Sequence, residues 1–119
     1  MEIKWTDVDP ETGQRRFLCA ERFAGEWQGE GCGAALSVVA NYLDVGDTIK
    51  PHRHPYAETF IVRRGVMALT VGDESIVCKE GQIIVAPPHV FHSFRNIGSG
   101  PLEMIDIHES GVFITEWAT

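Results

Sequence analysis

Turn-forming residues interrupt this chain at short and fairly regular intervals, and that spacing limits the folds it can adopt. The turn signals are Gly46-Asp47, Arg64-Gly65, Gly72-Asp73-Glu74, Glu80-Gly81, Pro87-Pro88 and Gly98-Ser99-Gly100-Pro101. The β-type runs that they separate are AALSVVANYLDV, DTIKPHRH, ETFIVRRG, VMALTVGD, ESIVCKE, QIIVAPP, VFHSFRN and LEMIDIHE. Apart from the stretch ETGQRRFLCAERFA, no segment repeats apolar residues at helical spacing. The pattern therefore predicts an all-β sandwich or barrel.

The 119 residues suffice for one domain with one core. We expect a barrel core over residues 34–109, between flanking segments 1–33 and 110–119. Both flanking segments carry tryptophan, with Trp5 and Trp27 in the first and FITEW in the second. They are expected to wrap the barrel or to reach a partner subunit.

The composition excludes several classes of partner. The formal net charge is −7, and the 10 Lys and Arg residues are scattered, so neither nucleic acid nor an anionic membrane is expected to bind. No apolar run approaches the roughly 18 residues of a spanning helix, and the start of the chain is polar, so we expect a cytoplasmic protein. The three cysteines form no CxxC pair, which argues against a zinc ribbon or a disulfide framework.

The stretch GDTIKPHRHPYAETFIVRRG places His52, His54 and Glu58 close together. On one straight strand, His52 and Glu58 would lie roughly 20 Å apart, too far to share a metal ion. Pro55 lies between them, and proline breaks a strand ladder. We therefore expect a turn here that brings Glu58 back beside the two histidines.

A metal site would need a fourth side chain from another strand. Three histidines with one carboxylate suit Zn, Fe, Mn, Ni or Cu. The candidates for the remaining position are His89, His92 and His108. His92 and Phe94 share one face of a strand, whereas His89 would point the other way.

The spacing of these residues resembles the two sequence motifs of the cupin family. The first motif is matched by Gly46, His52, His54, Glu58 and Gly65, and the second by Gly81, Pro87, His92 and Asn96. One position differs, because His89 stands where the family usually has glycine. That difference concerns the turn after Pro88 and leaves His92 in its expected place.

The resemblance implies a double-stranded β-helix, or jelly roll, that binds one divalent metal ion (Fe, Mn, Ni, Zn or Cu). The ligands that it implies are His52, His54, Glu58 and His92. It also implies a homodimer, since small single-barrel cupins commonly pair, and exposed sheet edges need covering.

Structural interpretations compete with functional ones at each of these positions. The histidines at 52 and 54 would be solvated strand residues, and Glu58 an ordinary strand-start charge, if no metal is bound. His89 is expected to be a loop or rim residue. His108 and Asp106 are expected on the outer face, because Ile105 and Ile107 occupy the apolar positions of that strand.

A pocket beside the metal would have apolar walls and a few polar groups. The expected apolar residues are Phe60, Val62, Val90 and Phe94, and the candidate polar residues are Tyr56, Asn41, Tyr42, Gln82 and His89. The catalytic residues are not determined by the sequence; the candidates are Glu58, Tyr56 and His89.

Two functions from different classes fit this sequence. The first is a metal-dependent enzyme acting on a small organic substrate. For it the resemblance favours dioxygenase chemistry, followed by isomerase, decarboxylase or lyase chemistry. The second is a non-catalytic module that binds or senses a small ligand through its metal. One fold hosts all of these functions, so the fold alone does not choose between them.

Overall fold

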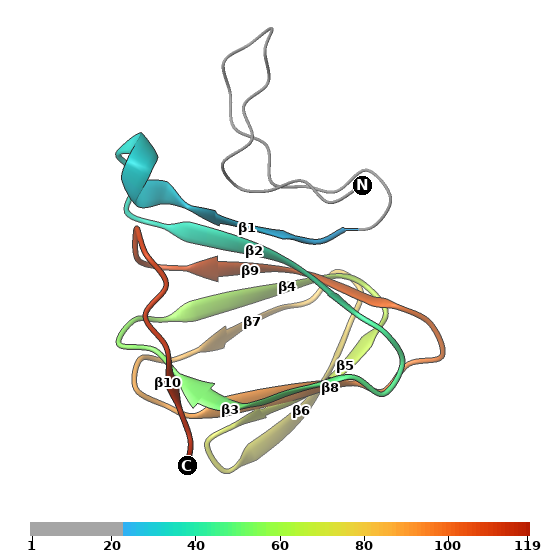
Figure 1. The fold of residues 1–119 in the computed structure, drawn as a ribbon. Helices are drawn as coiled ribbons and strands as arrows, with labels where there is room; N and C mark the ends of the chain where they lie inside the picture. Colours follow the sequence, from blue (N-terminus) through green and yellow to red (C-terminus); the bar gives the residue numbers. More distant parts are fainter. Residues whose placement is uncertain (1–22) are drawn as a thin grey trace, which may run out of the picture.

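The computed structural model describes residues 23–119, and it confirms the all-β prediction (Figure 1). The strands within this range are β1 (Gly25–Gln28), β2 (Ser37–Leu43), β3 (Thr48–Arg53), β4 (Glu58–Arg64), β5 (Val66–Val71), β6 (Glu74–Lys79), β7 (Ile83–Ala86), β8 (His92–Asn96), β9 (Leu102–His108) and β10 (Glu116–Trp117). One 3-10 turn, η1 (Gly29–Cys32), follows β1. None of the helical structure in this range is long and apolar enough to cross a membrane.

The strands form two five-stranded sheets that face each other (Figure 1). One sheet has the order β1-β2-β9-β4-β7, and the other has the order β10-β3-β8-β5-β6. All of the strand pairings are antiparallel. The chain passes from one sheet to the other at the connections β2–β3, β3–β4, β4–β5, β6–β7, β7–β8, β8–β9 and β9–β10. This is the predicted jelly roll.

The turn around Pro55 is one of these crossings. His52 lies in β3 of one sheet, and Glu58 begins β4 of the opposite sheet. A strand ends before the proline and a turn follows, as the sequence predicted, and this turn carries the chain to the opposite sheet. This crossing places Glu58 in the sheet that faces the sheet of His52.

The core lies between the sheets. Alternate residues of β4, namely Glu58, Phe60 and Val62, are buried, and β8 repeats the pattern with its own alternate residues. The apolar cluster consists of Leu43, Phe60, Val62, Met67, Leu69, Cys78, Ala86, Phe94, Leu102 and Met104. The inward polar residues at the start of β4 and β8 thus border a packed apolar interior, which positions them.

The C-terminal flanking segment wraps the barrel. In β10, Glu116 pairs with Arg53, and Trp117 pairs with His52, so the segment adds an edge strand beside β3. At the other end of the described chain, β1 pairs with β2. Trp5, and most of the stretch ETGQRRFLCAERFA, lie outside the described residues.

Candidate metal centre

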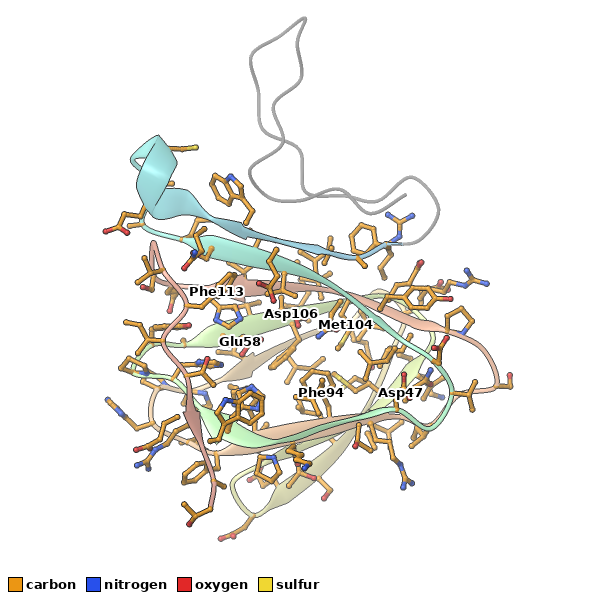
Figure 2. All side chains as sticks on the ribbon, in the orientation of Figure 1. Asp47, Glu58, Phe94, Met104, Asp106 and Phe113 are labelled. Atoms are coloured by element: carbon orange, nitrogen blue, oxygen red, sulfur yellow. The ribbon has the colours of Figure 1, made fainter. Side chains whose placement is uncertain are left out.

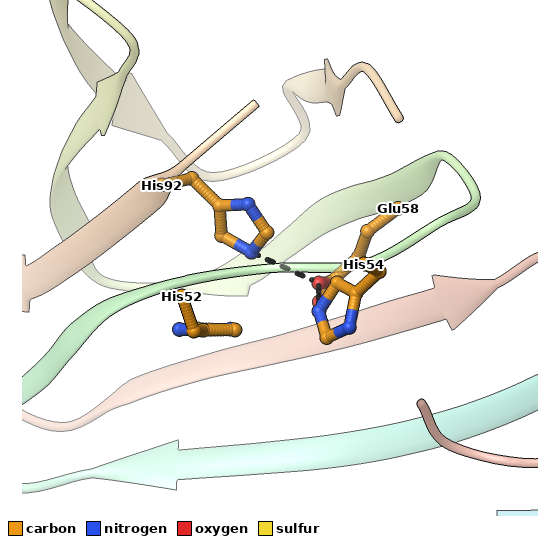
Figure 3. Close-up of side chains that lie close together, drawn as sticks. All are labelled: His52, His54, Glu58 and His92. Atoms are coloured by element: carbon orange, nitrogen blue, oxygen red, sulfur yellow. Dashed lines mark hydrogen bonds and ion pairs between the residues drawn. The ribbon is translucent and has the colours of Figure 1, made fainter. Parts of the chain in front are cut away.

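Four side chains converge between the sheets. One potential ligand atom from each of His52, His54, Glu58 and His92 lies within 4.8 Å of the others, and all four residues are buried (Figure 3). His52 comes from β3, His54 follows it directly, and Glu58 and His92 are the first residues of β4 and β8. Three segments from the two sheets therefore meet at one point.

Backbone carbonyls fix the orientation of two of the imidazoles. Nδ1 of His52 lies 2.8 Å from the carbonyl oxygen of Lys50, and Nδ1 of His54 lies 2.8 Å from that of Ile114. A carbonyl only accepts, so in each neutral ring Nδ1 carries the hydrogen and Nε2 carries the free lone pair. Metal-binding histidines are commonly held in this way.

The buried polar atoms fit a metal ion. Nε2 of His54 lies 2.9 Å from Oε1 of Glu58, but it has no well-directed hydrogen bond to a described residue. Nε2 of His92 lies 3.1 Å from the same oxygen. Imidazole nitrogens gathered around one carboxylate oxygen are a donor set that divalent transition metals accept.

The electrostatics favour an ionised Glu58. Burial alone would raise the pKa of Glu58, but its contacts with His108, His54 and His92 outweigh burial and hold that pKa well below its usual range. Burial lowers the pKa of His52 and keeps its ring neutral. For His54, the effect of burial is outweighed by Glu58, and the pKa is raised.

The prediction that His108 and Asp106 lie on the outer face is wrong. They are only 5% and 2% exposed, and their strand β9 presents Leu102 and Met104 inward in the same phase. The isoleucines at 105 and 107 suggested the opposite phase, but both faces of β9 are at least partly buried. Apolar residues on both faces of a strand make the phase ambiguous.

His108 extends the cluster through a chain of hydrogen bonds. The backbone N–H of Ile114 donates to the Tyr56 hydroxyl at 3.3 Å, which leaves the hydroxyl hydrogen for Nδ1 of His108, 2.7 Å away. Nε2 of His108 then carries its hydrogen toward Oε2 of Glu58, at 3.3 Å. This chain orients the carboxylate through Oε2, whereas His54 and His92 lie near Oε1.

The remaining predicted site residues have different locations. Phe60 and Val62 are part of the buried core, and Phe94 and Asn41 line a cavity beside the cluster. Gln82 is in an exposed turn, where its side-chain oxygen accepts from the backbone N–H of Lys79. Val90 lies in the turn before β8, close to Gly72, rather than on a strand facing the metal residues.

His89 takes the backbone conformation that suits glycine. Its φ is 65°, in the left-handed region, and its N–H donates to the carbonyl oxygen of His54 at 2.8 Å. Its side chain is exposed and borders a surface hollow together with Arg53 and Glu116. The turn shape is therefore kept although the residue differs.

The cavity has a volume of about 220 Å³ and opens beside the metal cluster. Its lining residues are Glu26, Val39, Asn41, Ile49, His52, His54, Glu58, Phe94, Asp106, His108, Phe113, Thr115 and Trp117. None of these lining residues is Lys or Arg. Figure 2 shows Glu58, Asp106 and Phe113 close together between the sheets. The cavity suits a small molecule that is held by metal coordination and apolar contact.

Comparison with known proteins agrees with this architecture. The chain is 32% identical over 83 residues to mannose-1-phosphate guanylyltransferase RfbM of Salmonella typhimurium, but the matched region is 64% of this chain and only 17% of that protein. A protein with a double-stranded beta-helix domain from Klebsiella pneumoniae superposes with a TM-score of 0.68 at 22% identity, covering 94% of this chain and 90% of that one. The oxalate decarboxylase formate complex from Lactobacillus farciminis superposes with a TM-score of 0.71 at 17% identity, covering 81% and 31%.

These structural likenesses are below 25% identity and show the fold alone. The model of the Cupin domain family, Cupin_2, matches residues 42–108, which include both groups of predicted ligands. That match covers more than half of the 119 residues. The chain belongs to the Cupin domain family.

Proposed function

We propose that this protein binds one divalent metal ion through His52, His54, Glu58 and His92, and uses it to transform a small organic molecule. The observation that carries the proposal is the convergence of four buried ligand atoms within 4.8 Å of one another. Two carbonyl-bound imidazoles with their Nε2 atoms free for the interior support it.

A bound ion would supply Lewis-acid or redox chemistry to a ligand that offers oxygen donors. The chain supplies the surroundings. Glu58 is ionised and is oriented by His108, and Phe94, Phe113 and Ile49 give the cavity apolar walls. Such walls strengthen the electrostatic contacts inside the cavity.

Oxygen-dependent cleavage of a diketone, catechol-like or enol-forming compound is the reaction that we propose first, and decarboxylation is the second. The similar structure of an oxalate decarboxylase shows that this barrel can carry the second chemistry in another protein. No Lys or Arg is among the described residues that line the cavity, which argues against a sugar phosphate or another polyanion as substrate.

The test uses the protein loaded separately with Fe(II), Mn(II), Ni(II) and Zn(II), with elemental analysis of each form. We expect oxygen consumption, or release of carbon dioxide, from a panel of such compounds with the Fe(II) or Mn(II) form. Glu58→Gln should abolish turnover, and Glu103→Gln on β9, away from the cavity lining, is the matched control. Ligand binding by every form without turnover by any would favour a non-catalytic sensing module instead.

We also propose a homodimer that covers the edge of the β1-to-β7 sheet. Among the described strands, β7 is the last of that sheet, and Ile83 and Val85 on it are 63% and 52% exposed. Unpaired edge strands with apolar side chains tend to associate. Sedimentation should give about twice the 13.2 kDa chain mass, and Val85→Lys should lower it. A wild-type mass near that of one chain at micromolar concentration would contradict the proposal.

A further inference from the structure

A second polar pair lies inside the cavity. Asn41 on β2 donates from Nδ2 to Oδ2 of Asp106 on the neighbouring strand β9, at 3.0 Å. Both residues line the same cavity as His52, His54 and Glu58. Neither Asn41 nor Asp106 is among the four converging ligands, so metal binding does not account for the pair.

Only half of the Asp106 carboxyl group is satisfied. The residue is 2% exposed, and its Oδ1 has no hydrogen-bond partner among the described residues. Leaving a buried polar oxygen without a partner is costly, so native structures rarely tolerate it without a reason. Asp106 lines the cavity beside the candidate metal ligands, so a ligand bound there would supply the missing partner.

We propose that Oδ1 of Asp106 hydrogen-bonds to a neutral acceptor oxygen on the molecule that the metal holds. The preferred ligand is therefore a small compound with chelating oxygens at one end and an uncharged carbonyl group at the other. This inference rests on the proposed metal-dependent function and names the ligand class for the same site. Asp106 acts as a specificity residue, and Asn41 positions it.

The direction of this hydrogen bond follows from the surroundings of the carboxyl group. Burial raises the pKa of the Asp106 carboxyl group well above its usual range, although the bond from Asn41 opposes this. Because Asn41 donates to Oδ2, that oxygen acts as an acceptor, and the carboxyl hydrogen is on Oδ1. A carboxylate tail on the ligand is disfavoured, since no Lys or Arg is among the described residues that line the cavity and could pair with it.

The inference is tested by calorimetric binding of matched hydroxamates to the Zn(II)-loaded protein. The hydroxamate group chelates the metal in every probe. 4-Oxopentanohydroxamic acid ends in a neutral ketone, 4-methylpentanohydroxamic acid has a methyl group in place of the ketone oxygen, and succinic monohydroxamic acid ends in a carboxylate. We expect the ketone to bind about tenfold more tightly than the hydrocarbon, as one buried hydrogen bond allows. The carboxylate should bind more weakly than the ketone.

Two variants identify the residue responsible. Asp106→Asn keeps a donor and an acceptor in the same shape, so it should keep the preference for the ketone. Asp106→Leu should abolish the preference while the hydrocarbon probe still binds. Zinc content is measured for each protein, and the wild-type comparison stands even if Asp106→Leu does not fold.

Each outcome bears on a different claim. Equal affinity of the zinc-loaded wild type for the ketone and the hydrocarbon, or tighter binding of the carboxylate, overturns the role of Asp106 and leaves the metal site standing. Loss of the ketone preference in Asp106→Asn also overturns it, because the neutral donor is then not what matters. A wild-type protein that retains no zinc overturns the proposed function, and this inference with it.

Discussion

The hydroxyl group of Tyr56 holds the outer end of the chain that orients Glu58, and its removal should weaken metal binding. Tyr56→Phe deletes the partner of Nδ1 of His108 and of the backbone N–H of Ile114. His108 is only 5% exposed, so water does not readily replace the lost bond. An unsatisfied buried group of this kind costs about 1–3 kcal/mol.

Loss of the Tyr56 hydroxyl should lower both the free energy of unfolding and the affinity for the metal ion. Without the hydroxyl, His108 is free to turn or to exchange tautomers, and Oε2 of Glu58 loses its fixed partner at 3.3 Å. Loss of an outer-shell partner typically lowers metal affinity 10–100-fold, or about 1.4–2.7 kcal/mol. We therefore expect the Zn(II) dissociation constant to rise by about that factor, with a lower free energy of unfolding for the metal-free protein.

The assay is competition for Zn(II) against a chelating dye, with urea unfolding of the metal-free protein in parallel. Tyr42→Phe is the matched control, because it removes the same group from β2 at a residue that does not line the cavity. A Tyr56→Phe protein with unchanged zinc affinity would refute the idea that this chain supports the carboxylate ligand.

Three further predictions concern protonation and the backbone. Metal occupancy should fall below about pH 6 because protons compete with the metal ion for the imidazole nitrogens. Occupancy that persists to about pH 4, measured by elemental analysis after buffer exchange, would argue against three histidine ligands. His89→Gly should stabilise the protein by up to about 1 kcal/mol in urea unfolding, because φ at this residue is 65°. The relief of backbone strain in the folded protein exceeds the entropy that glycine adds to the unfolded chain. Destabilisation would show that the histidine side chain stabilises the folded protein. Folding raises the pKa of Asp106, so the folded protein holds this proton more tightly than the unfolded chain does. The free energy of unfolding should therefore fall by about 1.4 kcal/mol per pH unit as the pH rises from about 4 toward the folded pKa. Asp106→Asn should remove that slope from the metal-free protein, and identical pH profiles for the two proteins would show that the carboxyl group is ionised when folded.

The sequence predicts the barrel and three of the clustered residues, His52, His54 and Glu58, because these depend on local spacing. Glycines and prolines mark the turns, and Pro55 between His54 and Glu58 indicates the crossing between sheets. His92 joins the others because β3 and β8 are neighbours, with His52 opposite His92. That pairing is nonlocal, and it was expected from the family resemblance rather than from the residues alone.

His108 and Asp106 were missed because the apolar pattern of β9 has two readings. Ile105 and Ile107 suggested one phase, whereas Leu102 and Met104 mark the true inward face. Met104 carries the correct signal, because it lies on the same face of the strand as Asp106 and His108 and is apolar. The hydrogen bonds from Ile114 to Tyr56 and from Tyr56 to His108 depend on how the C-terminal segment wraps the barrel, which spacing along the chain does not reveal.

The most direct test of the central claim is the metal content per chain of His92→Ala compared with His89→Ala, after each protein is loaded with Zn(II) and freed of excess ion. These two histidines are three residues apart, but only His92 is buried in the cluster, while the His89 side chain is exposed. The account predicts one zinc ion per chain in the wild type and in His89→Ala, and a large loss of zinc in His92→Ala. Full occupancy in His92→Ala together with loss of zinc in His89→Ala would contradict the metal centre described above.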